Sequence, residues 1–267
     1  MKPYKFAPLG VLLLLVAITS GCNRLKARDQ LNKGVAAYRN AQFQAAIVHF
    51  KGAVALDPTL LNARLYLATA YAQQYIPGGE SSDNVKIAKQ AISAFDDVLR
   101  MDPSNSTAMA SVAQIYYNMK DFEKAKDYQR QWLKIEPNNP VPYYWIGVIN
   151  WAICFPRTQQ MRKDLKLDFP KNPKDPNTLP PLPEKARAKL EEQNGPLVQE
   201  GIEVLEKAIQ LKPNDFDTMA YLNLIYRQKA DLETDPSASA ADLRLAEDWV
   251  NKALAVKKQG TQGASAQ

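Results

Sequence analysis

Residues 106–139 read STAMASVAQIYYNMKDFEKAKDYQRQWLKIEPNN, and this stretch decides the fold. Apolar residues recur at i, i+3, i+4 and i+7 in its first half: Met109, Val112, Ala113 and Tyr116. A second helically spaced set follows a polar turn: Phe122, Ala125, Tyr128, Gln129 and Trp132. Because a period of 3.6 residues places such positions on one face, the stretch predicts two amphipathic helices packed face to face.

The same arrangement recurs along the chain. Four amphipathic segments end at a proline that cannot continue a helix: Pro58, Pro103, Pro137 and Pro213. Pro103 and Pro137 are 34 residues apart, whereas the intervals on either side are 45 and 76 residues. One regular interval between two longer ones predicts repeated helix pairs, some of which carry insertions.

The recurring small, aromatic and proline positions resemble the tetratricopeptide-repeat family. Small Gly34 and Ala46, with aromatic Phe43 and Phe50, fit residues 27–60 to the same pattern. The resemblance implies an all-α fold, a right-handed α-solenoid of five helix pairs over residues 25–258. The expected units are 27–60, 61–105, 106–139, 140–215 and 216–258.

Three of these units are interrupted. A loop is predicted at residues 77–83 in the second unit and another at 234–237 in the fifth. The fourth unit holds an insertion at 154–195, where seven prolines between 156 and 183 favour extended structure, followed by a short helix over 184–193. This insertion is predicted to lie on the solenoid, either over its groove or as a surface of its own. The tail 259–267 is predicted to be disordered.

The first 21 residues differ from the rest. Two lysines precede an apolar run over residues 9–18, and small residues then lead to Cys22. The run is short for a membrane-spanning helix and suits a secretory signal. Gly21-Cys22 resembles the cleavage site of a bacterial lipoprotein, which implies a signal peptide over 1–21 and lipidation of Cys22. An ordinary cleaved signal is the alternative.

Composition narrows the class of function. Hydrophobic residues make up 46% and charged residues 23%, as in folded soluble proteins. The net charge of +6 is dispersed along the chain, which argues against nucleic acid as a partner. The two cysteines cannot form a disulfide framework, and Cys154 is expected to be a buried free thiol.

No motif for catalysis, a metal or a cofactor is present. The single histidine, His49, has no nucleophile or ligand cluster near it in sequence. The sequence therefore predicts a protein that is not an enzyme and carries no cofactor and no metal.

The resemblance implies a ligand groove on the inner faces of the first helices. The corresponding residues are Arg39, Gln73, Gln114, Tyr117, Asn118, Tyr144, Trp151, Arg227 and Gln228. Their amide and aromatic groups suit an extended peptide. For Tyr144 and Trp151 the alternative is a packing role under the insertion. A clamp for a terminal carboxylate is not expected, because the matching positions hold apolar Leu31 and Val35.

Two functions follow from these patterns. The first is a lipid-anchored scaffold on the periplasmic side of a bacterial envelope, at the outer rather than the inner membrane, which binds a protein or extended peptide. The second is a soluble secreted or periplasmic module that regulates a separate enzyme or assembly.

Overall fold

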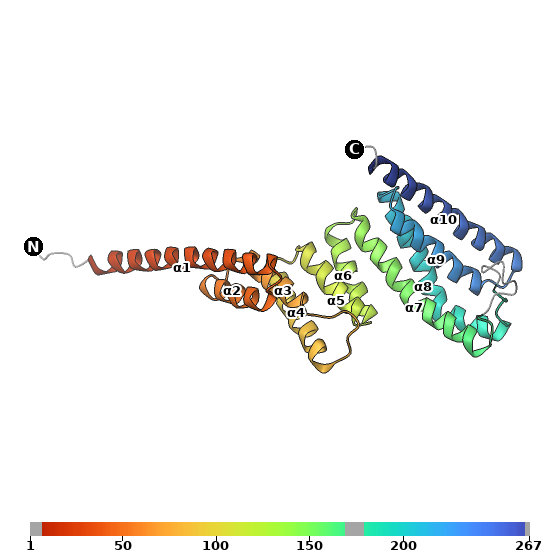
Figure 1. Ribbon diagram of the computed structural model, residues 1–267, viewed down its shortest axis with the longest axis horizontal. Helices are drawn as coiled ribbons and strands as arrows, with labels where there is room; N and C mark the ends of the chain where they lie inside the picture. Colours follow the sequence, from red (N-terminus) through yellow and green to blue (C-terminus); the bar gives the residue numbers. More distant parts are fainter. Residues whose placement is uncertain (1–6, 169–178, 265–267) are drawn as a thin grey trace, which may run out of the picture. The chain divides into compact units, whose positions relative to one another are not determined.

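A computed structural model of the chain describes residues 7–168 and 179–264, with side chains for 22–168 and 179–258. Ten α-helices make up this part of the chain (Figure 1). Their bounds are α1 Ala7–Arg39, α2 Phe43–Leu56, α3 Leu61–Ala72, α4 Ser82–Met101, α5 Ser106–Asn118, α6 Phe122–Ile135, α7 Pro140–Asp164, α8 Glu184–Leu211, α9 Phe216–Leu232 and α10 Pro236–Ala264. The predicted all-α class is confirmed.

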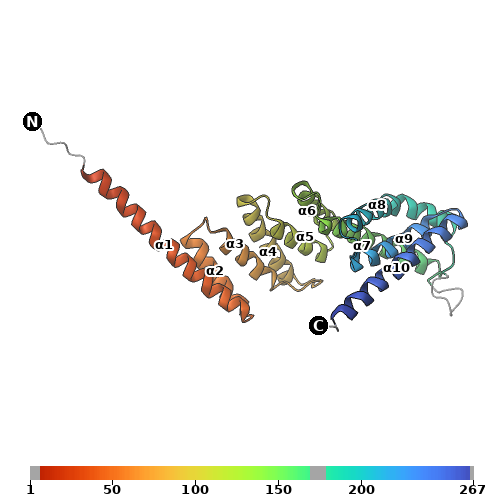
Figure 2. The same cartoon turned by 90° about the horizontal axis from the view of Figure 1, so that it is seen from above.

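The helices form two compact units, Met1–Asp121 and Phe122–Gln267. The first contains α1 to α5 and the second α6 to α10, so the boundary falls inside the repeat 106–139. In the first unit α1 packs on α2 and α3 on α4, while in the second α7 packs on α8 and α9 on α10. Figures 1 and 2 show α9 and α10 side by side.

Small residues allow close contact within these pairs, as the repeat pattern predicts. A Cβ atom at Gly34 would lie 2.4 Å from the Phe50 ring, and one at Gly147 would lie 2.4 Å from Leu205 Cγ. Ala46 and Phe50 are fully buried, and Leu31 and Val35 pack against the same cluster. Leu31 and Val35 are therefore core residues of the first unit.

The predicted helix ends at the four prolines are confirmed. Helices α2, α4, α6 and α8 each end two residues before the proline. The next helix then begins with a side-chain cap at three of these junctions, and at α7 the cap is Asn139, whose Oδ1 accepts from Val141 N (3.0 Å). Asn105 Oδ1 accepts a hydrogen bond from Ala108 N (3.0 Å), and Asp215 Oδ2 accepts one from Thr218 N (3.1 Å).

The prediction of extended structure between residues 156 and 183 is wrong for the start of that stretch. Helix α7 continues through Pro156 to Asp164. A proline inside a helix removes one backbone hydrogen bond and crowds the preceding turn. Pro156 is exposed, whereas Thr158 and Arg162 are buried beyond it, so packing carries the helix onward.

The predicted end of the second insertion helix before Gly195 is also wrong. Helix α8 runs unbroken from Glu184 through Gly195 and Pro196 to Leu211. The residues that hold it across this point form one buried stripe: Leu190, Asn194, Val198 and Ile202. Residues 169–178, with three of the insertion's prolines, lie outside the described residues.

Two further predictions fail near the C-terminus. The loop predicted at residues 234–237 is shorter than expected, because α10 already begins at Pro236, a residue suited to a first helical turn. Helix α10 also extends to Ala264, into the tail predicted to be disordered, since adding residues to an existing helix costs less than starting one. Residues 265–267 lie outside the described part.

The loop predicted at residues 77–83 is close to its prediction and has a defined structure. Residues 73–81 join α3 to α4, and Gly78 has a φ of +75°, which favours glycine. Among the described residues, no helix is both long and apolar enough to cross a membrane.

Candidate functional site

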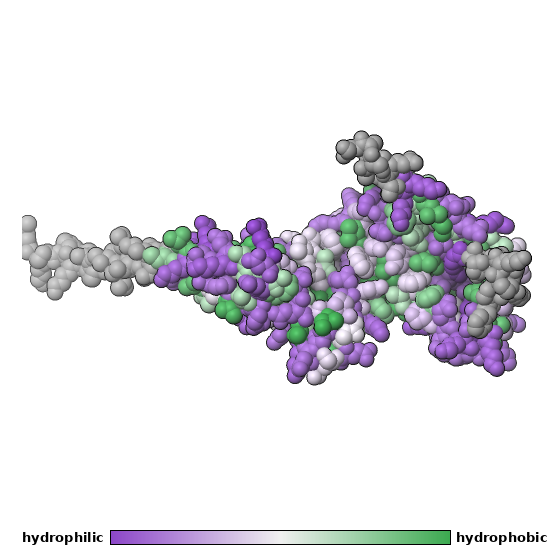
Figure 3. Space-filling view, viewed as in Figure 1, coloured by the Kyte–Doolittle hydropathy of each residue, from purple (hydrophilic) through white to green (hydrophobic). Residues whose placement is uncertain are grey.

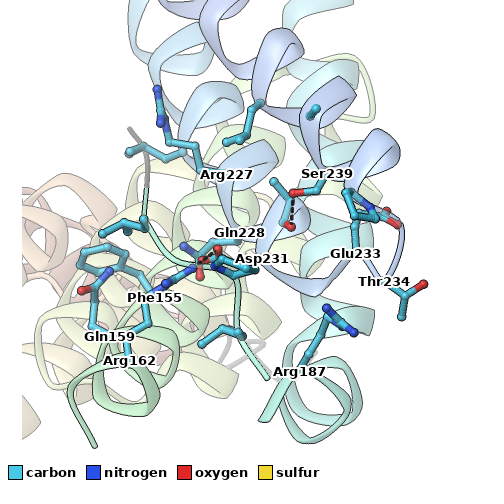
Figure 4. Close-up of a pocket in the computed structure, with 18 of the residues that line it drawn as sticks. Phe155, Gln159, Arg162, Arg187, Arg227, Gln228, Asp231, Glu233, Thr234 and Ser239 are labelled. Carbon is cyan, nitrogen blue, oxygen red and sulfur yellow. Dashed lines mark hydrogen bonds and ion pairs between the residues drawn. The ribbon is translucent and has the colours of Figure 1, made fainter. Parts of the chain in front are cut away.

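A pocket of about 460 Å³ lies within the second unit, between α7, α9, the start of α10 and the segment 179–187 (Figure 4). Most of its wall is apolar or aromatic, and charged residues stand at several points around it. Its lining residues are Trp151, Phe155, Gln159, Arg162, Leu179, Pro181, Leu182, Arg187, Leu224, Arg227, Gln228, Ala230, Asp231, Glu233, Thr234, Pro236, Ser239, Ala240 and Leu243.

Helix α7 supplies one wall through residues at i, i+4, i+8 and i+11: Trp151, Phe155, Gln159 and Arg162. The Trp151 and Phe155 rings stack with their centroids 4.9 Å apart. Tyr221 of α9 meets the edge of Trp151, with ring centroids 5.6 Å apart. These ring contacts fix the aromatic end of the pocket.

Arg162 joins the insertion to the following helix pair. Its Nη1 donates to the carbonyl oxygens of Pro180 (2.8 Å) and Leu167 (3.4 Å). Its Nη2 forms an ion pair with Asp231 of α9, and Figure 4 shows these two side chains pointing at each other. Only 2% of the Arg162 side chain is exposed. Because this buried guanidinium bonds to Leu167 and Pro180, it holds the two residues on either side of the segment 168–179 against the core.

Asp231 balances the charge of Arg162 at this point. Burial raises the pKa of the Asp231 carboxyl, although Arg162 opposes the shift. An arginine this buried needs a counterion, because an unpaired charge in the interior is strongly unfavourable.

A buried polar network lies behind the pocket and joins α7, α8 and α9. Thr158 Oγ1 donates to Gln228 Oε1 (2.8 Å), and Asn194 Nδ2 donates to Thr158 Oγ1 (3.3 Å) and to the Cys154 carbonyl (3.3 Å). The predicted burial of Cys154 is confirmed. Burial raises the pKa of the Cys154 thiol to about 12, which leaves it unreactive as a nucleophile.

A second polar cluster fastens α6 to α7 and α8. Glu200 accepts hydrogen bonds from Arg130 (2.7 Å) and Asn150 (2.9 Å), and buried Lys126 lies 3.6 Å away. Although burial opposes ionisation, the hydrogen bonds from Arg130 and Asn150 hold the pKa of Glu200 below its usual value. The cluster is internal to the unit and lines none of the pocket.

The nine residues predicted for the groove are divided between the two units. In the first unit, Arg39 and Gln73 are exposed at the ends of α1 and α3. The other three, Gln114, Tyr117 and Asn118, are half-buried on α5, where Gln114 Nε2 donates to Asn118 Oδ1 (3.1 Å). Burial raises the pKa of Tyr117. Their binding role stays a prediction.

In the second unit, the pocket brings together three predicted residues, Trp151, Arg227 and Gln228. Arg227 Nε donates to Asn223 Oδ1 (2.9 Å), while Gln228 is only 5% exposed and belongs to the buried network. Tyr144 lies outside the pocket and meets Tyr221 edge-on, with centroids 5.6 Å apart. Tyr144 and Trp151 both pack against the core that includes Leu222 and Ile225, and Trp151 also lines the pocket, so their binding role stays a prediction.

The sequence interpretation missed Phe155, Arg162, Arg187 and Asp231. Phe155 and Arg162 lie on the part of α7 where extended structure was expected. The helical stripe that begins at Trp151 would have revealed Phe155 and Arg162 if α7 had been continued past Pro156. Asp231 gave no local signal, because its partner is 69 residues away in sequence.

No group of three His, Cys, Asp or Glu side chains within the described ranges is placed to hold a metal ion. His49 is half-buried, with its Nδ1 2.9 Å from Gln30 Oε1. This contact joins α1 to α2 and lies in the first unit.

The successive packed helix pairs define an α-helical repeat protein. A family model described as tetratricopeptide repeat matches residues 106–139. Residues 106–139 are thus a tetratricopeptide repeat, as their sequence pattern predicts, and the similar proteins support the same family for the helix pairs around it.

Known proteins share this repeat or this fold. Interferon-induced protein with tetratricopeptide repeats 2 of Cricetulus griseus is 26% identical over 131 residues, which cover 49% of this chain and 23% of that protein. A crystal structure of MamA matches with a TM-score of 0.56 at 14% identity, covering 89% of this chain and 94% of that one. YrrB, described as a TPR protein with an unusual peptide-binding site, matches with a TM-score of 0.50 at 13% identity, covering 86% and 90%. At these identities the two structures show the shared solenoid fold alone.

Proposed function

We propose that the chain is an interaction scaffold whose second unit holds an extended segment of a partner protein in the pocket between α7, α9 and α10. Tetratricopeptide repeats form scaffolds for protein–protein interaction, which supplies the class of function. The observation that carries the proposal is the aromatic wall of Trp151 and Phe155, which faces the polar side chains of α9 in a partly open pocket.

We further propose that a lipid on Cys22 anchors the chain to the periplasmic face of a bacterial outer membrane. Gly21-Cys22 supports this, and the following Asn23 offers no acidic signal for inner-membrane retention. The Cys22 side chain is exposed, as an attached lipid requires.

Crosslinking from neighbouring positions tests the binding site. A photoreactive amino acid at Gln159, which lines the pocket, is expected to capture a protein in intact envelopes. The same substitution at exposed Gln160, whose side chain bonds to Asp164, is the matched control. Equal capture from both positions, or none from Gln159, would contradict the proposal.

Fatty-acid labelling tests the anchor. A Cys22→Ala variant is expected to lose all incorporation of a radioactive fatty acid. Mature protein in the soluble periplasmic fraction, cleaved at a site other than Gly21-Cys22, would instead select the unlipidated module.

A further inference from the structure

The apolar walls and the charged groups of the pocket lined by Arg187 determine which side chains of a partner segment fit it. We propose that it accepts a bulky apolar side chain next to an acidic residue, both supplied by one extended segment of the partner. The proposal rests on the proposed function and names the class of segment that this site takes.

The size and walls of the pocket define the apolar part of the ligand. A volume of about 460 Å³ suits side chains, and it is too small for a helix about 10–12 Å wide. Trp151, Phe155, Leu224 and Leu243 surround this space with apolar surface. An aromatic or large aliphatic side chain is therefore the group that gains most from entering it.

The walls are fixed before a ligand arrives. Leu182 is 5% exposed within the core, and Arg162 holds the carbonyl of Pro180 next to it. On the opposite side, Ser239 Oγ donates to the Ala230 carbonyl (2.9 Å) and joins α10 to α9. A pocket with such supported walls does not need to form at the moment of binding.

Within the ranges that the structure describes, the charge of Arg187 on the pocket wall has no acidic partner. Asp231 pairs with Arg162, and Glu233 lies 3.5 Å from Lys229. Arg187 projects from α8 on the side of Glu233 and Thr234, apart from the Arg162–Asp231 pair (Figure 4). Among the described residues its Nε has no hydrogen-bond partner. A carboxylate is the group that best satisfies a guanidinium, since it can accept two parallel hydrogen bonds.

Other unmet groups on the pocket wall are also donors. Within the described part of the chain, Trp151 Nε1 and Arg162 Nε are buried without an acceptor, as is Arg187 Nε. Indole and guanidinium nitrogens only donate. The pocket wall therefore offers donors rather than acceptors, which suits a ligand that carries acceptors such as backbone carbonyl groups and a carboxylate.

Selection from a random linear 12-residue peptide library tests this inference on mature protein carrying Cys22→Ser. Selected peptides are expected to place Trp, Phe or Leu next to Asp or Glu. Arg187→Glu should weaken the best peptide by about tenfold or more, as for the loss of one charge-assisted hydrogen bond. Changing the peptide's acidic residue to Lys should restore its binding to that variant.

Two matched pairs control the test. Lys185→Glu makes the same charge change on an exposed residue of α8 outside the pocket, and it should leave affinity within about twofold. Ala240→Trp fills the pocket from its exposed rim and should abolish binding, while Arg244→Trp on the outer side of α10 should not.

Several outcomes would overturn the inference. One is an equal loss of peptide affinity in Arg187→Glu and Lys185→Glu. Another is a library that yields no peptide whose binding Ala240→Trp abolishes. A third is displacement of the peptide by sodium dodecanoate, with an affinity similar to that of the peptide. If a photoreactive residue at Gln159 still captured a partner in envelopes while Arg187→Glu left peptide affinity unchanged, the proposed function would stand. The proposed preference for an acidic residue would then be wrong.

Discussion

The connection between α3 and α4 and the connection between α7 and α8 are each held by a buried polar side chain of their own. These two side chains differ in charge. Asn84 holds residues 73–81: its Oδ1 accepts from Ile76 N, and its Nδ2 donates to the carbonyls of Ile76 and Gly79, all at 2.8 Å. Arg162 holds the longer connection after α7 through the carbonyls of Leu167 and Pro180.

The difference between an amide and a guanidinium decides how far each connection reaches. Asn84 is neutral, and its contacts lie within one helix pair. Arg162 carries a buried charge and therefore recruits Asp231 from the next pair. The first connection is a local loop, whereas the second couples two repeats and forms one wall of the pocket.

Removing the charged clamp should have the largest effect. Arg162→Ala leaves Asp231 without its counterion and two carbonyls without a donor, so it should lower the free energy of unfolding by about 3–5 kcal/mol. Chemical denaturation followed by circular dichroism measures this loss. Lys163→Ala, at the exposed next residue, should change stability by about 0.5 kcal/mol or less. A loss of under about 1 kcal/mol for Arg162→Ala would show that the clamp does not couple the repeats.

Removing the neutral clamp should cost less. Asn84→Ala deletes three hydrogen bonds but leaves no charge, and water can reach the exposed part of the loop at Pro77 and Gly78. The expected loss is about 1–3 kcal/mol in the same denaturation experiment. Asp83→Ala, at an exposed site on the same first turn, is the control. A cost equal to that of Arg162→Ala would remove the distinction between the two clamps.

The sequence predicts one of these connections better than the other, for a physical reason. Glycine, proline and serine between residues 77 and 82 mark a turn by their own backbone preferences, so the loop after α3 could be placed. After Trp151 the prolines predicted the wrong structure, because α7 continues through exposed Pro156 and buried Arg162 beyond it contacts Asp231 of α9. Local patterns specify helix pairs, whereas contacts across repeats specify how far each helix extends.

The same limit applies to the candidate site. The resemblance to the tetratricopeptide-repeat family selected Trp151, Arg227 and Gln228, which all line the pocket. It could not select Arg187 or Asp231, since their importance comes from a charge balance among residues of three different helices. It also could not show that Gln228 bonds to buried Thr158, since that contact spans 70 residues.

The smallest expected effect is a difference in pH dependence between the two clamps. Burial raises the pKa of Asp231 above its ordinary value of about 3.9, so in the window above that value the folded chain holds a proton that the unfolded chain has released. This carboxyl therefore makes the free energy of unfolding fall as pH rises through the window, and Asp231→Asn should remove that contribution.

Arg162→Ala should raise the pKa of Asp231 further, because the opposing guanidinium is gone. Its cost should then be smaller at pH 4 than at pH 7, since a protonated carboxyl needs no counterion. Asn84 does not titrate, so the cost of Asn84→Ala should be the same at both values. Denaturation of each variant and the wild type at pH 4 and pH 7 measures the two differences. If the cost of Arg162→Ala were also independent of pH, the unpaired Asp231 would not be its cause, and the comparison between a charged and a neutral clamp would reduce to the number of hydrogen bonds each one makes.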